Sequence, residues 1–211
     1  MTETDAVHSL NSGPEIEIKI KGSRFLGRAF EAVTEDEARV ELAALKKKAY
    51  DATHHCSAWK IGPPEKPIER HDDDGEPNGS AGPPILGAIH QSGLINALVV
   101  VTRYYGGTKL GTGGLVKAYG EAARLALAEA PRKTLWRRES LVIRCAFDDL
   151  GPVETLVGKA AAHTLEVERV FEPEPEVRLV LKQSRVDDLA NALVEATAGR
   201  VKLERESLGI A

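Results

Sequence analysis

Three consecutive aspartates and a glutamate stand in one short run, Asp72–Pro84 (DDDGEPNGSAGPP), together with three glycines and three prolines. Carboxylates hold cations or basic side chains, while glycine and proline fix the backbone that carries them. We call this run the acidic segment and interpret it as a rigid loop that presents Asp73, Asp74 and Glu76. An EF-hand is excluded, because Arg70 would stand at its first ligand position.

A second run, Thr102–Gly120 (TRYYGGTKLGTGGLVKAYG), leaves a β-branched strand and enters a helix through five glycines. At such a turn the first N–H groups of the helix are free to bind an anion. This glycine-rich segment does not match the Walker pattern, since Thr108 rather than glycine directly precedes Lys109. It does not match GxGxxG either, since Val116 occupies the last glycine position. Alternatively, the glycines only permit positive φ or close packing. The candidate cradle residues are Gly111, Gly113 and Gly114.

The two segments carry opposite charge. Six acidic and two basic residues lie between Glu65 and Glu76, whereas Thr102–Lys117 contains three basic residues and no acidic one. Either the segments pair with each other, or one of them holds an external ion. The basic candidates for phosphate contact are Arg103, Lys109 and Lys117.

A short run of potentially reactive side chains, His54-His55-Cys56, lies in a predicted strand. Successive side chains of a strand point to opposite faces, so His54 and Cys56 share one face and His55 lies on the other. A packed or hydrogen-bonded role is favoured over catalysis, because nothing in the sequence indicates a lowered pKa for Cys56. We assign no catalytic residue, metal or cofactor and keep His54 as a candidate binding residue.

The composition is that of a globular protein. The 211 residues are 42% hydrophobic and 28% charged, with a net charge of −4. This balance gives no global basic field for nucleic acid, so any such binding must be local. Two cysteines outside any CxxC pattern indicate neither a disulfide framework nor a zinc site. With no signal peptide and no apolar run long enough for a bilayer, we expect a cytoplasmic protein that has no membrane partner.

The first part of the chain alternates predicted strands and helices. A hairpin over 15–32 precedes a helix that starts at the capping box of Thr34 and Glu37. A strand is expected over 53–61, and Gly62–Gly82 has no periodicity and is expected to be an irregular surface loop. A helix over 84–90, a strand over 96–102 and a helix over 115–130 complete this part.

From Glu139 onward, the predicted order is strand, helix, strand, strand, helix, strand, which is typical of a ferredoxin-like βαββαβ domain. The basic run Pro131–Arg138 is interpreted as a solvated linker, with a phosphate-contacting patch as the alternative. The expected organisation is α+β with two domains: a flexible N-terminus over 1–14, an N-terminal β/α domain over 15–135 and a ferredoxin-like C-terminal domain over 136–211.

Four segments resemble the IMPACT or YigZ family: KGSRFLG, ATHHCSAWKIG, DDGEPNGSAGPPIL and VVVTRYYGGTKLGTGGLVKAYG. They cover the whole first domain, and the second half is similar to the domain that follows it in bacterial members. The chain is identified as a bacterial YigZ-like member. The resemblance implies a first domain of the ribosomal-protein and translation-factor type. It also implies a non-enzymatic role linked to translation and, through eukaryotic relatives, to stress responses.

Three functions remain open on this basis. The first is a translation-linked regulator that binds ribosome, RNA or a translation-associated protein through its basic glycine-rich segment. The second is an enzyme or binding protein for a phosphorylated small molecule, with His54 or Asp74 as acid or base. In the third, the acidic and glycine-rich segments pair with each other and are purely structural.

Overall fold

The computed structural model describes residues 5–211 and divides them into two compact units. One unit is His8–Thr134, and the other contains Leu135–Ala211 together with residues at the start of the chain up to Val7. Each unit has its own sheet and its own buried apolar cluster. The fold class is α+β, as predicted from the sequence.

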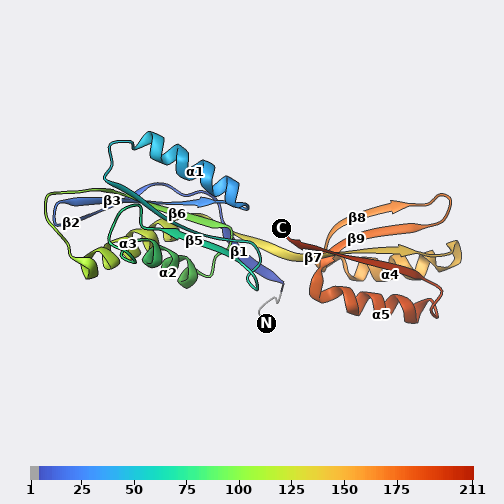
Figure 1. The fold of residues 1–211 in the computed structure, drawn as a ribbon. Helices are drawn as coiled ribbons and strands as arrows, with labels where there is room; N and C mark the ends of the chain where they lie inside the picture. The colour runs from blue at the N-terminus through green and yellow to red at the C-terminus, as the bar shows by residue number, and fades with distance from the viewer. Residues whose placement is uncertain (1–4) are drawn as a thin grey trace. The chain divides into compact units, whose positions relative to one another are not determined.

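The N-terminal unit is built on an antiparallel sheet with strand order β2-β3-β6-β4-β5. Its strands are β2 (Ile16–Ile20), β3 (Ser23–Glu31), β4 (His54–Ile61), β5 (Ile68–Asp72) and β6 (Ala97–Tyr104), and its helices are α1 (Glu35–Lys48), α2 (Gly82–Ser92) and α3 (Thr112–Glu129). The helix α1 covers one face of the sheet, and α2 and α3 cover the other (Figure 1).

Alternation along the strands explains these two layers. In β6 every residue from Ala97 to Thr102 is buried, because Val99 and Val101 face α2 and α3 while Leu98 and Val100 face α1. The capping box holds the start of α1, where the Thr34 hydroxyl accepts the Glu37 backbone N–H. The helix α3 is rich in alanine, and its buried alanines let it lie close against the sheet.

The C-terminal unit takes strand β7 (Arg132–Arg144) from Leu135 onward. After it come α4 (Leu150–Lys159), β8 (Thr164–Val170), β9 (Glu176–Lys182), α5 (Val186–Ala196) and β10 (Lys202–Ile210). Its antiparallel sheet places β7 between β10 and β9, and β8 next to β9. Helices α4 and α5 lie on one face of this sheet (Figure 1). They contribute Val153, Val157 and Leu193 to the buried apolar cluster of this unit. This βαββαβ arrangement confirms the ferredoxin-like prediction.

Three segments differ from the sequence expectation. Ile68–Asp72, expected within an irregular loop, is the edge strand β5, which the sequence hid because most of its side chains are exposed and polar. The basic run after Pro131 is not a linker but the start of β7. Within the N-terminus expected to be flexible, Ala6–Leu10 forms strand β1, whose Val7 and Leu10 are buried. Residues 1–4 lie outside the described part of the chain.

Candidate functional site

The acidic segment forms a tight turn between β5 and α2. Asp74, Gly75 and Gly79 all have positive φ, which glycine adopts freely and aspartate tolerates better than most residues. The Asp72 carboxylate accepts the backbone N–H of Asp74 at 2.9 Å and closes the first part of the turn. The sequence therefore encodes a preformed loop whose carboxylates have fixed positions.

Asp73 turns inward and holds the start of α2. Its two carboxylate oxygens accept the backbone N–H groups of Gly79, Ala81 and Gly82, each at 2.8 Å. Burial by itself would raise the pKa of Asp73, but these three donors outweigh it and the pKa lies below its usual range. Asp73 thus contacts none of the predicted phosphate-binding bases, because its carboxylate caps a helix.

Asp74 contacts a base that the sequence analysis did not single out. Its carboxylate pairs with Lys46 of α1 at 2.7 Å and accepts the backbone N–H of His55 at 2.7 Å. Burial raises the pKa of Asp74, while Lys46 and the His55 N–H lower it more strongly, so the net direction is downward. This carboxylate joins α1 to β4 across the acidic segment.

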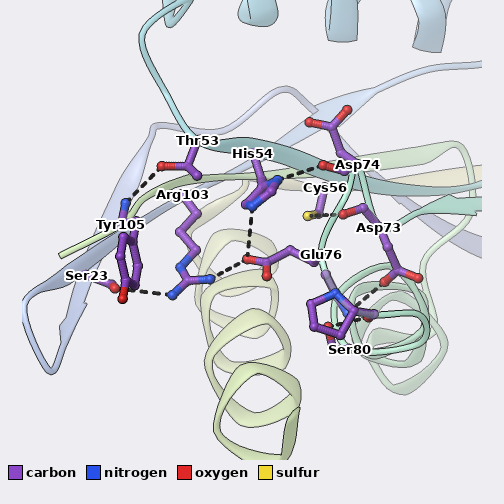
Figure 2. A network of polar contacts seen from close by, with 12 residues as sticks. Ser23, Thr53, His54, Cys56, Asp73, Asp74, Glu76, Ser80, Arg103 and Tyr105 are labelled. Carbon is purple, nitrogen blue, oxygen red and sulfur yellow. Dashed lines mark hydrogen bonds and ion pairs between the residues drawn. The ribbon is translucent and has the colours of Figure 1, made fainter. Parts of the chain in front are cut away.

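Glu76 and Arg103 form a buried ion pair at the centre of the site (Figure 2). Arg103 Nη1 donates to Glu76 Oε1 at 2.6 Å, and the two side chains are 6% and 4% exposed. The same oxygen accepts the hydroxyl of Tyr119 of α3 at 2.7 Å. The acidic and glycine-rich segments therefore do pair with each other, but through Arg103 alone among the three predicted bases.

Aromatic rings enclose the guanidinium of Arg103. Its carbon lies 5.3 Å from the ring centre of Phe25 and 5.4 Å from that of Tyr105. Arg103 Nη2 also donates to the Ser23 hydroxyl at 3.4 Å. Because Arg103 as a whole is 5% exposed, its charge is committed to these contacts.

The two faces of β4 lie as the sequence predicted. His54 Nδ1 donates to the carbonyl of Asp74 at 2.7 Å, so Nε2 faces Glu76 at 4.0 Å (Figure 2). On the other face, His55 Nδ1 lies 3.1 Å from the hydroxyl of Thr102. Cys56 donates to the carbonyl of Asp73 at 3.0 Å, and burial raises the pKa of its thiol to about 12. A thiol of this pKa is protonated at neutral pH and is a poor nucleophile.

The glycine-rich segment is anchored at one end. Gly106 lies against the Lys21-Gly22 turn so closely that a Cβ atom there would come 2.0 Å from the Gly22 carbonyl carbon. The backbone N–H of Gly106 donates to the Ser23 hydroxyl at 3.1 Å. Only glycine fits this contact, which holds the loop to the β2–β3 hairpin.

The helical end of the segment is open. Gly111 (φ 73°) precedes the first residue of α3 and has no side chain that could accept a backbone N–H. A Cβ atom on Gly113 would meet no neighbour, and one on Gly114 would touch only Leu110, at 3.1 Å. Packing therefore explains Gly106 well, but it does not require glycine at position 113.

Lys109 and Lys117 remain exposed, and within residues 5–211 neither has a hydrogen-bond or ion-pair partner. Lys117 borders a hollow of about 370 Å³ over α2 and α3, which adjoins a second hollow of about 250 Å³ that reaches Arg132. The two hollows share Arg124, and Glu121 is their only acidic lining residue. We call the surface made by these hollows the basic groove.

Removing the Asp73 charge is expected to destabilise the N-terminal unit. Asp73→Asn keeps the side-chain shape but weakens three charge-assisted hydrogen bonds, at a cost of about 1–2 kcal/mol. Because the folded pKa is lowered, this stabilisation is present above the unfolded pKa and is lost as the pH falls through the folded pKa. Urea unfolding of both proteins at neutral and acidic pH measures it. A difference that stays constant with pH would contradict this role.

The described part of the chain contains no group of three His, Cys, Asp or Glu side chains arranged to hold a metal ion. Among its helices, none is long and apolar enough to cross a membrane.

Comparison with known proteins identifies the class. The Impact N-terminal domain family matches residues 21–127, which contain the acidic segment, the glycine-rich segment and the network around Arg103. The fold is thus an Impact-type domain followed by a βαββαβ domain. A solved structure described only as a hypothetical protein agrees with it at TM-score 0.65 and 29% identity, covering 95% of this chain and 97% of its own.

The chain belongs to the IMPACT family. It is 40% identical to the IMPACT family member in the pol 5'region of Thermus thermophilus, over 88% of this chain and 99% of the relative. It is 31% identical to the IMPACT family member YigZ of Escherichia coli, over 88% of this chain and 90% of the relative. The structure of the two-domain translational regulator Yih1 matches 58% of this chain and 47% of its own at 29% identity, with a TM-score of 0.38. That low score supports no conclusion about the present chain.

Proposed function

We propose that this protein is a non-enzymatic, translation-linked factor that binds RNA phosphates, on the ribosome or free, through the basic groove and the open end of the glycine-rich segment. The observation that carries the proposal is the division of the charged residues. Arg103, Asp73, Asp74 and Glu76 make ion pairs or hydrogen bonds within the fold, whereas Lys109 and Lys117 have no partner among the described residues. The link to translation comes from the family resemblance. The expected cytoplasmic location comes from the sequence analysis.

The arrangement around α3 suits a phosphate chain. Lys117 and Arg124 are seven residues apart, two helical turns, so they lie on one side of α3 about 10 Å from each other. Arg132 extends the basic groove, and Lys109 stands before the first turn of α3, where the helix dipole favours an anion. The one acidic residue of the groove, Glu121, pairs with Arg124 at 2.7 Å, so the excess positive charge comes from Lys117 and Arg132. Such an excess matches a polyanion better than a small neutral ligand.

The buried network has a supporting role in this proposal. The Glu76–Arg103 pair and the Gly106–Gly22 contact fix the anchored end of the loop, so Lys109 projects from a rigid base. A preformed surface loses less conformational entropy when it binds. In this proposal the acidic segment braces the fold, and the neighbouring glycine-rich segment presents Lys109 to solvent.

Density-gradient fractionation of a lysate tests the proposal. The wild type is expected to migrate with ribosomal particles at low salt, and a Lys109→Ala, Lys117→Ala double variant is expected to stay at the top of the gradient. The control is Lys47→Ala, Lys48→Ala, which removes the same charge from exposed positions on α1.

Salt dependence of RNA binding provides the second readout. Each lost phosphate contact on single-stranded RNA should flatten the slope of log affinity against log salt by about 0.7, so the double variant should lose about 1.4. If it binds like the α1 control, or if wild-type binding is independent of salt, the groove is not a phosphate site.

A further inference from the structure

The exposed ring of Tyr105, near the start of the glycine-rich segment, is a feature that phosphate binding by the basic groove does not explain. Tyr105 is 45% exposed, although one side of it lies against the buried guanidinium of Arg103 (Figure 2). An aromatic ring held at the surface is available for stacking. Its position beside exposed cations is the arrangement that proteins use to bind single-stranded nucleic acid.

The ring is held in place by contacts on both sides of the residue. The backbone N–H of Tyr105 donates to the Thr53 hydroxyl at 3.0 Å, and the next residue, Gly106, is fixed against the β2–β3 hairpin. The guanidinium carbon of Arg103 lies 5.4 Å from the centre of the Tyr105 ring and 5.3 Å from that of the buried Phe25 ring. A ring held in this way loses little freedom when a ligand covers it.

Two exposed lysines belong to the segments that meet next to this ring. Lys21 belongs to the turn that touches Gly106, and Lys109 lies four residues after Tyr105. Both are exposed, and neither has a partner within residues 5–211. An aromatic surface flanked by unpaired lysines fits a ligand that carries both phosphates and accessible planar bases.

We propose that Tyr105 is a stacking platform for an unpaired base. The RNA that binds the basic groove and the open end of the glycine-rich segment is then single-stranded rather than duplex. This inference rests on the proposed function and specifies its ligand. In a duplex the bases are stacked inside the helix and cannot reach Tyr105, whereas an unpaired base can lie on the ring while its neighbouring phosphates meet the lysines.

Three RNA probes separate stacking from phosphate contact. They are an oligouridylate of about ten nucleotides, an abasic oligomer of the same length, and a blunt-ended RNA duplex without a loop. Tyr105→Leu should weaken oligouridylate binding roughly five- to 160-fold, since stacking on an aromatic side chain has an effect of that size, and leave abasic and duplex binding unchanged. Tyr105→Phe keeps the ring and should bind like the wild type.

The matched control is Phe171→Leu, since Phe171 is also 45% exposed but lies in the C-terminal unit. It should bind every probe like the wild type. The NMR signals of the Tyr105 ring protons distinguish stacking from a purely structural role. Oligouridylate should shift these signals upfield, and the abasic oligomer should not. Circular dichroism confirms that each variant is folded.

The outcomes distinguish the two proposals. If Tyr105→Leu binds oligouridylate as tightly as the wild type, or if the wild type binds the abasic oligomer equally well, stacking is wrong. If Lys109→Ala, Lys117→Ala leaves binding of all three probes unchanged, the phosphate surface is wrong as well. A wild type that binds none of the probes overturns both.

Discussion

Glu76→Ala is expected to destabilise the N-terminal unit by about 3–5 kcal/mol, because it leaves the buried Arg103 charge without its partner. Arg103 cannot turn toward water without opening the contacts to Ser23, Phe25 and Tyr105. The Tyr119 hydroxyl would lose its acceptor at the same time. Because a single carboxylate oxygen serves both groups, we expect this substitution to have the largest effect on stability.

Urea unfolding measures this effect, followed by the fluorescence of Trp59 in a Trp136→Phe background. Trp59 then reports on the N-terminal unit alone. Glu121→Ala is the matched control, since it removes a Glu–Arg pair whose side chains are 47% and 57% exposed and should cost about 1 kcal/mol or less. A loss at Glu76 no larger than this would show that the buried pair does not brace the site.

Gly106→Ala is the second substitution with a large expected effect. The new Cβ atom would lie 2.0 Å from the Gly22 carbonyl carbon and 2.4 Å from the Ser23 nitrogen. Both are backbone atoms, so no side-chain rotation relieves the overlap, and the loop or the hairpin must move. We expect a cost of about 3 kcal/mol, the upper part of the range for overpacking. The displaced loop should also bind RNA more weakly.

Gly113→Ala gives the comparison within the same segment. Its Cβ atom would meet no neighbour, and it lies in α3, where alanine is favoured over glycine by up to about 1 kcal/mol. Thermal melts should therefore show opposite shifts for the two variants. Hydrogen exchange at the Gly106 amide adds a local readout, because the alanine variant should lose the bond to Ser23. Equal stability of Gly106→Ala and wild type would refute the close contact.

The candidate site was only partly predictable. The opposite charges of the two segments predicted either that they pair or that one holds an external ion, and the structure brings Glu76 and Arg103 together. Lys46 and Tyr119 were missed, because they reach the site from helices α1 and α3. Tyr119 lies within the glycine-rich segment, but only the packing of α3 shows that its hydroxyl meets Glu76. The strand positions of His54, His55 and Cys56 were predicted because the alternation of side chains in a strand is local.

The sequence by itself determined the α+β class, the ferredoxin-like second half and the family, since periodicity, turn residues and dense motifs are all local signals. It missed β1, which pairs with the distant strand β7, and β5, which pairs with the neighbouring strand β4 but has mostly exposed polar side chains. Only the tertiary structure decided which charges neutralise each other and which face solvent. Burial depends on the packing of α1, α2 and α3 around one sheet, so a sequence in which Arg103 and Lys109 look equivalent cannot show that only Lys109 is free to bind.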